Sequence, residues 1–312
     1  MKESELLKHV YGYNRQLPES VSIGPGDDMG GVLIDGRLVL VAVDQVIDGI
    51  HVDMGVTTVD QAGCKAVLRN LSDVAAMAAR PVGAVVAVVL PGDFGTDRAT
   101  GMFDVMRDVL EAYCCPLIGG DISIGTGPLV ISVTVFAEPA GIEPVLRSGA
   151  RPGDAIYVTG ELGGSTELVS GRVHHIDFSP RIKLARFLAS ESKTRPHCMI
   201  DVSDGLAKDL GNLARASGVH MCVDAQRLPV SAAARSLSSR TGRPIWQHAV
   251  GDGEDYELLF TATCGVMPPQ VEGVPITEIG TVLRQSDKPE ASIRLPDGCE
   301  ENLNRYGWEH GR

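Results

Sequence analysis

The residues most able to do chemistry are acids in short motifs, each beside a glycine or at the end of an expected strand. The first motif is the run GPGDDMGG at residues 24–31, where glycines flanking Asp27 and Asp28 let the backbone approach a ligand closely. Adjacent carboxylates in such a loop suit a hard cation that prefers oxygen ligands, although a polar turn before a strand explains this run equally well. Similar acids recur at Asp44, Asp73, Asp121, Asp201, Asp204 and Glu254. We therefore expect one metal–phosphate site at which these acids converge.

Two later motifs carry the strongest local signals. In IDVSDGLAKDL, Asp201 and Asp204 stand three residues apart at an expected helix start, where they could hold Mg²⁺ together. The alternative is that Asp201 or Ser203 caps the helix and that Asp204, in its first turn, favours the positive end of the dipole. The run GDGEDYELLF has four acids in seven residues just before an expected strand. A solvated loop explains Asp252 and Asp255 well, and Glu254 less well.

Several common catalytic and binding motifs are absent from the sequence. It has no GxxxxGK[ST] pattern and no GxGxxG followed by a helix, while GGDISIG at 119–125 resembles a glycine-rich loop that approaches phosphate. Without HExxH or paired CxxC motifs, zinc is not expected, and a serine hydrolase would lack its GxSxG elbow. We expect His174 and His175 to lie in an exposed loop.

Bulk properties exclude other classes of protein. The chain has 312 residues, enough for one large or two ordinary domains, and a formal charge of −12 without any dense Lys/Arg block. A nucleic-acid partner or an anionic membrane surface is therefore not expected. No stretch reaches the roughly 18 apolar residues needed to span a bilayer, and the charged N-terminus does not resemble a signal peptide. The seven cysteines, of which Cys114 and Cys115 are adjacent and the others scattered, indicate reduced thiols, so we expect a soluble cytoplasmic protein.

The elements that must position these acids can be predicted from periodicity. Residues 32–43 indicate a hairpin with a turn at Asp35-Gly36, and Asp44 is expected to end its second strand. A helix is expected over 57–79, with Pro81 beyond its end. Lys65, Arg69 and Asp73 follow at steps of four on one face of this helix, and for the two cations we favour a solvated ion-pair ladder.

The rest of the chain alternates strands and helices without a strict βαβ rhythm, which favours an α+β fold. Strands are expected at 82–91, 116–121, 129–137, 155–160, 221–225 and 256–263. Helices are expected at 96–113, at 179–190 with Ser179 as N-cap, and after Asp204 up to Gly218. The Gly/Pro-rich run at 147–154 marks a domain boundary, which divides the chain into 1–146 and 147–312.

The ordered combination of motifs resembles the thiamine-monophosphate kinases over nearly the whole chain. That family belongs to the superfamily that also contains aminoimidazole-ribonucleotide synthetase, selenophosphate synthetase and a hydrogenase maturation protein. The motifs are GDD at 26–28, VD-x4-GIH at 43–51, NLSDVAAMAARP at 70–81, GGD at 119–121, RSGARPGDAIYVTGELG at 147–163, SPR at 179–181, IDVSDGLAKDL at 200–210 and GEDYELLF at 253–260. NLSDxAAM and GEDYEL discriminate this family from its relatives.

The resemblance implies a homodimer with a two-domain aminoimidazole-ribonucleotide synthetase-like α+β fold. Its N-terminal domain has a mixed or antiparallel sheet, binds metal and ATP and pairs across the dimer, and its C-terminal α+β domain closes the nucleotide and substrate site. It also implies ATP-dependent phosphorylation of thiamine monophosphate to the diphosphate with several Mg²⁺ ions. Matched motif by motif, the metal ligands would be Asp28, Asp44, Asp73, Asp121, Asp201 and Asp204. ATP would contact Gly120, Asp121, Arg147 and Ser203, and the substrate would contact His51, Glu254 and Trp308. Asp27 would keep a local hydrogen-bonding role.

The chemistry and the departures from the family pattern set the alternatives. The nucleophile would be a phosphate oxygen already ionised at neutral pH, so we expect no catalytic general base. Ala42 and Val43 stand where the family usually has hydroxyl residues, and Gly164 and Asp252 stand where it usually has Asp and Gly. These changes leave open a divergent paralogue acting on another phosphate or acyl substrate, or a non-catalytic nucleotide-binding regulator.

Overall fold

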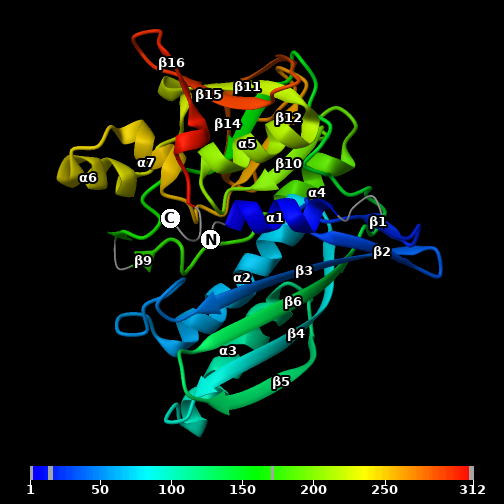
Figure 1. Ribbon diagram of the computed structural model, residues 1–312, viewed down its shortest axis with the longest axis vertical. Coiled ribbons are helices and arrows are strands. Elements are labelled where there is room, and N and C mark those ends of the chain that lie inside the picture. The colour runs from blue at the N-terminus through cyan, green and yellow to red at the C-terminus, as the bar shows by residue number, and fades with distance from the viewer. Residues whose placement is uncertain (1–2, 13–16, 170–171, 309–312) are drawn as a thin grey trace.

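The computed structural model describes residues 3–12, 17–169 and 172–308 and is built on two large β-sheets (Figure 1). The first sheet, in the lower half of Figure 1, comes from the N-terminal half of the chain, and the second comes from the C-terminal half. The mixture of sheets and separate helices confirms the predicted α+β fold. The sheets lie on either side of the expected boundary at 146/147, although the boundary itself stays a prediction. Among the described residues, no helix is both long and apolar enough to cross a membrane.

The first sheet has the strand order β1-β2-β3-β6-β4-β5. Its strands are β1 (Val21–Ile23), β2 (Gly30–Ile34), β3 (Arg37–Ile47), β4 (Arg80–Pro91), β5 (Leu117–Gly125) and β6 (Val130–Glu138). Neighbouring strands are antiparallel except for β4 and β5, which are parallel. The predicted hairpin is β2–β3, and its turn residues Asp35 and Gly36 both have positive φ, as a tight hairpin turn requires. Asp44 lies inside β3 rather than at its end, because the strand continues to Ile47.

The second sheet has the order β10-β12-β7-β14-β11-β15-β16 and is antiparallel except between β11 and β15. Its strands are β7 (Ala155–Thr159), β10 (Cys198–Asp201), β11 (Val219–Asp224), β12 (Leu258–Ala262), β14 (Val274–Gln285), β15 (Glu290–Arg294) and β16 (Glu300–Asn302), with β13 (Gln270–Val271) beside β14. A separate ribbon pairs β8 (Leu168–Val169) with β9 (Arg172–Val173). The sequence patterns did not predict β13 to β16, β8 or β9.

The α-helices are α1 (Glu3–Tyr11), α2 (Val59–Ala76), α3 (Thr96–Ala112), α4 (Ile182–Ser190), α5 (Leu206–Ser217), α6 (Ala232–Thr241) and α7 (Ile245–Gly251). Short 3-10 turns lie at Ala225–Arg227 and Leu303–Arg305. Helix α4 begins two residues later than predicted for a first helical Pro180, and Arg181 rather than Ser179 occupies its N-cap position. Helix α5 begins after Gly205, so Asp204 precedes the helix and neither Asp201 nor Ser203 caps it.

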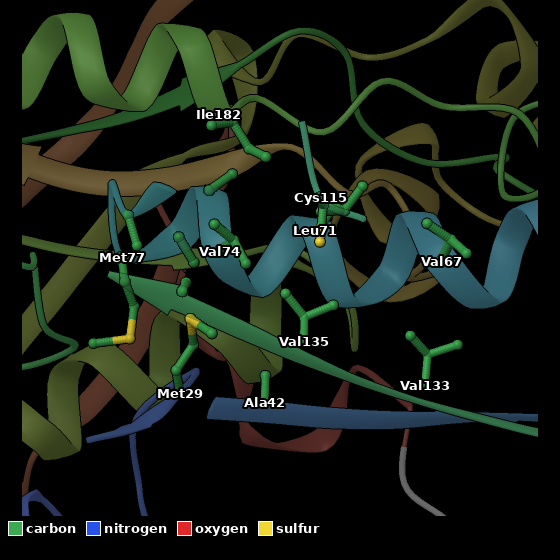
Figure 2. Close-up of a cluster of buried hydrophobic side chains, with 14 of the residues drawn as sticks. Met29, Ala42, Val67, Leu71, Val74, Met77, Cys115, Val133, Val135 and Ile182 are labelled. Carbon is green, nitrogen blue, oxygen red and sulfur yellow. The ribbon is translucent and has the colours of Figure 1, made fainter. Parts of the chain in front are cut away.

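Helix α2 is the central element that joins the two halves. Thr58 and Gln61 close a capping box at its start, with each side chain accepting from the other residue's backbone N–H. The helix packs on β3, β6 and α3 of the first half and on α4 and β10 of the second. Figure 2 shows Leu71 and Val74 of α2 beside Val133 and Val135 of β6 within the main core cluster. Because α2 is packed on several sides, its polar residues Lys65, Asn70 and Ser72 are buried as well.

Candidate active site

A cavity of about 1040 Å³ lies between the two halves of the chain. Residues from β3 and its following loop, from α2 and from the loop before α5 line it. So do Arg147 of the connecting segment, the loop that follows α7, and Trp308. The cavity brings together most of the residues that the sequence predicted for the site: Asp28, Asp44, His51, Asp73, Arg147, Asp201, Ser203, Asp204, Glu254 and Trp308.

Three of these acids form a tight cluster. Asp28 of the loop before β2, Asp73 of α2 and Asp201 at the end of β10 each offer a carboxylate oxygen, and the three atoms lie within 4.8 Å of one another. Burial raises the pKa of Asp201 to about 7, and the charge of Asp28 adds to the shift. Burial, followed by the charge of Asp44, raises the pKa of Asp73 well above its ordinary value. A cation beside such a cluster favours its ionised form.

The donor set fits a divalent oxygen-preferring cation such as Mg²⁺. Oδ2 of Asp28 is buried and has no hydrogen-bond partner among the described residues, which is an arrangement that a bound cation would satisfy. The cluster offers carboxylate oxygens alone, without a sulfur or imidazole ligand. These residues would therefore hold the metal.

Asp44 and Asp204 line the same cavity but are already paired with cations. Nε of Arg69 lies 3.3 Å from Oδ2 of Asp44, and Nζ of Lys208 lies 2.6 Å from Oδ2 of Asp204. Burial raises the pKa of Asp44, whereas Arg69 lowers it. Arg69 thus forms an ion pair with an acid of the cavity, and the prediction that it belongs to a solvated ion-pair ladder is wrong.

The motif NLSD positions the acids through residues that the sequence analysis left without a role. Asn70 accepts a hydrogen bond from the backbone N–H of Asp44 at 3.1 Å and donates to the carbonyl of Ala66. Ser72 donates to Oδ2 of Asp201 at 2.6 Å, across the boundary between the halves. Both side chains are buried. Their place in a motif with Asp73, on a helix, was the signal that could have found them.

Arg147 connects the opening loop to the cavity. Its Nη2 donates to Oδ1 of Asp28 at 2.7 Å, and its backbone N–H donates to Oδ1 of Asp27 at 3.0 Å. This contact fits the local hydrogen-bonding role expected for Asp27. The Nε of Arg147 is buried without a hydrogen-bond partner in the described chain. A guanidinium at the cavity wall beside the acidic cluster is suited to bind a phosphate that metal ions bridge to those acids.

The segment 252–257 is held by buried contacts and is not a solvated loop. Asp255 is 2% exposed and accepts from the backbone N–H of Gly163, so the solvated interpretation of Asp255 is wrong. Tyr256 stacks on Phe178 with ring centroids 3.9 Å apart. Glu254 and Tyr256 both have positive φ, a backbone strain of about 1–3 kcal/mol each that often accompanies functional sites. The Glu254 side chain lies at the cavity wall.

The predictions of a solvated Lys65 and of an exposed loop for His174 and His175 were also wrong. Lys65 is fully buried and forms an ion pair with Glu254 at 2.7 Å. His175 is half-buried, lines the cavity and contacts both Lys65 and Glu254, while His174 bonds to the carbonyl of Asp255. Neither histidine lies in a free surface loop. Helical spacing alone did not show that the face bearing Lys65 is covered by the second half of the chain.

Gly120 and Asp121 are not among the residues that line the cavity. They lie on the edge strand β5 and are exposed. Within one chain, the structure therefore does not bring these two residues to the site, contrary to the expectation of one converging set.

Two departures from the family pattern contact each other. The backbone N–H of Gly164 donates to Oδ2 of Asp252 at 2.9 Å, and Asp252 lines the cavity. Gly164 has φ +73°, and a Cβ there would lie 2.5 Å from the backbone N of Ala234. A side chain at position 164 would therefore clash in this arrangement, and the Asp252 carboxylate lies against the backbone of Gly164.

Asp209 is a further buried acid in the motif IDVSDGLAKDL. It is 1% exposed, and its Oδ2 accepts from the backbone N–H of Asp204 at 3.1 Å. Burial, followed by the charge of Asp204, raises its pKa well above its ordinary value. Asp209 thus fixes the turn that carries Asp204.

Comparisons with known proteins agree with this fold and site. Residues 26–138 match the family described as "AIR synthase related protein, N-terminal domain", and residues 151–285 match "AIR synthase related protein, C-terminal domain". The chain is therefore an AIR synthase related protein.

Curated relatives narrow the family. The thiamine-monophosphate kinase of Rhodopirellula baltica is 36% identical over 292 residues, which cover 90% of this chain and 89% of that protein. The thiamine-monophosphate kinase of Escherichia coli is 31% identical and covers 99% of this chain and 98% of its own length. A solved structure described as "AaThiL complexed with AMPPCP and TMP" superposes with a TM-score of 0.82 at 26% identity, over 99% of this chain and 97% of that one. The chain belongs to the thiamine-monophosphate kinase family.

Proposed function

We propose that this protein is an ATP-dependent thiamine-monophosphate kinase that uses several Mg²⁺ ions to form thiamine diphosphate. The observation that carries the proposal is the convergence of Asp28, Asp73 and Asp201 beside Arg147 in one cavity between the two halves. The relative solved as "AaThiL complexed with AMPPCP and TMP" supports ATP and thiamine monophosphate as the two substrates.

The site's residues divide into three groups, which would hold the metal, contact ATP and bind the acceptor. Asp28, Asp44, Asp73, Asp201 and Asp204 would hold Mg²⁺. When bound, the ions would neutralise two phosphate groups that otherwise repel each other as they are brought into line. Arg147 and Ser203 would orient the ATP phosphates, and His51, Glu254 and Trp308 would bind the acceptor. No side chain needs to remove a proton, because the acceptor phosphate is already ionised at neutral pH.

A homodimer would complete the site. The face of the first sheet opposite α2 leaves Val43 61% and Val89 38% exposed. Paired residues run across that face from Gln45 through Ser132 and Ala87 to Asp121, and paired residues point to the same side. Gln45 and Val43 also line the cavity, so this face borders it. A second copy covering the face would bury its apolar residues, and a role for Gly120 and Asp121 in ATP or metal binding requires that copy.

We also propose a cytoplasmic location without nucleic-acid or membrane partners. All seven cysteines are free thiols, as expected in a reducing compartment, and the formal charge is −12.

The deciding experiment is an assay of the purified protein with ATP, Mg²⁺ and thiamine monophosphate. We expect thiamine diphosphate and ADP in equal amounts. If ATP binds but no diphosphate forms, the protein is a nucleotide-binding regulator and the proposal fails. Turnover with a different phosphate or acyl acceptor, and none with thiamine monophosphate, identifies a divergent paralogue.

A further inference from the structure

Lys65 is a buried cation whose hydrogen-bonding capacity is fully used. The residue lies in α2 and is 0% exposed. Its Nζ donates to the backbone carbonyl of His51 at 2.8 Å and lies 2.7 Å from Oε1 of Glu254 and 2.6 Å from Nδ1 of His175. An ammonium group has three N–H donors and no acceptor, so each donor meets one acceptor here.

The three acceptors come from distant parts of the chain. His51 lies in the loop after β3, His175 follows β9, and Glu254 lies between α7 and β12. All three residues line the cavity, whereas Lys65 is not a lining residue and lies behind the wall. One side chain therefore joins the wall contributed by the first half of the chain to the wall contributed by the second.

His175 contacts both members of this ion pair. Its Nδ1 lies 2.6 Å from Nζ of Lys65 and 3.0 Å from Oε2 of Glu254. The imidazole is therefore placed where the two charged groups meet.

Burying this charge is costly, and stability alone does not explain it. Burial lowers the pKa of Lys65, and the charge of Glu254 opposes that shift. Replacing a buried ion pair by apolar side chains of similar volume is often neutral or stabilising. A fully buried lysine that holds three cavity-lining residues in place therefore points to a demand for position at the wall.

We propose that Lys65 is the positioning residue of the acceptor end of the cavity. Its ammonium holds His51 and Glu254, one from each half of the chain, at the separation that the acceptor needs, and His175 completes the contact. The expected occupant is a phosphate monoester that carries a cationic heteroaromatic group. This proposal rests on the proposed function, because that function assigns His51 and Glu254 to the acceptor.

The test is the Lys65→Met variant, which keeps the length of the side chain but removes its charge and its donors. We expect the KM for thiamine monophosphate to rise about tenfold or more, since hydrogen bonds to charged groups contribute about 1.5–3 kcal/mol. The KM for ATP should stay close to its wild-type value, because the ATP side of the cavity keeps its contacts. His175→Gln changes a half-buried residue of the cavity wall. It should also raise the KM for thiamine monophosphate, by a smaller factor, and leave the KM for ATP unchanged. Lys183→Met, an exposed lysine on α4, is the matched control and should leave both constants unchanged.

Equal rises in the two KM values, or a loss of kcat with an unchanged acceptor KM, would overturn the proposal. If Lys65→Met does not fold, the split in His175→Gln decides. A crystal structure of Lys65→Met supplies a readout independent of activity. Movement of the Glu254 carboxylate away from His175, together with a shift of the His51 peptide, supports the positioning role, and unchanged positions refute it. If the wild-type protein does not phosphorylate thiamine monophosphate, the proposed function fails, while this structural comparison still decides the role of Lys65.

Discussion

The hydroxyl of Ser72 donates a 2.6 Å hydrogen bond to Oδ2 of Asp201, so a helix of the first half directly orients an acid of the second. Ser72 precedes Asp73 in the chain, and Asp73 and Asp201 belong to the same cluster of carboxylates. The relative placement of the two halves and the geometry of the metal site therefore depend on the same contact.

Removing this hydroxyl should weaken metal binding more than it weakens the fold. In Ser72→Ala, Oδ2 of Asp201 loses its donor, and the loss of such an outer partner typically costs about 10- to 100-fold in metal affinity or activity. We expect the Mg²⁺ concentration that gives half-maximal activity to rise accordingly, as measured by titrating Mg²⁺ at saturating ATP. Ser190→Ala removes an exposed hydroxyl that bonds within α4 and serves as the control. An unchanged Mg²⁺ requirement in Ser72→Ala would contradict this role.

Asp73→Asn should separate function from stability. Asp73 is half-buried among like charges, and Asn resembles its protonated form, so the variant relieves repulsion in the metal-free protein. We expect activity to fall by about 100-fold or more, since losing a direct metal ligand should cost at least as much as losing a residue that hydrogen-bonds to a ligand. The midpoint of thermal unfolding without Mg²⁺ should be unchanged or higher, and the rise in midpoint on adding Mg²⁺ should shrink.

The control for this prediction is Asp60→Asn, which changes an exposed acid in the first turn of the same helix. Its activity and its response to Mg²⁺ should match the wild type. If Asp73→Asn unfolds the protein while the residual folded fraction keeps its rate, Asp73 is structural.

Much of the site could be predicted from the sequence because its acids stand in short contiguous motifs. Asp28 and Glu254 lie in turns and Asp201 ends a strand just before one, and the glycines of these turns are visible in the chain itself. The status of Lys65 could not be predicted. A helical period shows which residues share a face, but it does not show that α2 is covered by a second domain as well as by its own sheet. The separation of Asp121 from the other acids within one chain could not be predicted either, because a Gly-Gly-Asp motif does not show that its strand lies at the edge of the sheet.

Glu254 should make unfolding depend on pH under acidic conditions. Although burial alone would raise its pKa, hydrogen bonds and charge from His175 and Lys65 lower the pKa from 4.5 to about 2. A carboxylate with a lowered folded-state pKa contributes stability that is complete above pH 4.5 and is lost as the pH falls toward 2. The full contribution is roughly 3 kcal/mol. The wild type should therefore lose more stability over this range than Glu254→Gln, as followed by urea unfolding at each pH.

Other carboxylates titrate in the same range, so only the difference between the two proteins is informative. Glu19→Gln removes an exposed carboxylate and should keep the wild-type slope. Parallel slopes for the wild type and Glu254→Gln would show that the ion pair with Lys65 does not act on folding stability.

The open face of the first sheet should be the surface through which two copies associate. Val89 lies on this face, is 38% exposed and does not line the cavity. In Val89→Glu, a charge would be buried in the contact between copies, and we expect the protein to elute as a monomer whose mass is confirmed by light scattering. Leu283→Glu places the same charge at a similarly exposed apolar position on β14 and should leave the dimer intact.

The activity of the monomer then tests the position of Asp121. If the partner's strand completes the site, the Val89→Glu monomer should lose activity. Mixing an inactive Asp73→Asn chain with an inactive Asp121→Asn chain should restore part of it, because one of the two sites in a mixed dimer then has both acids intact. A fully active monomer would show that Asp121 is not needed and that one chain contains the whole site.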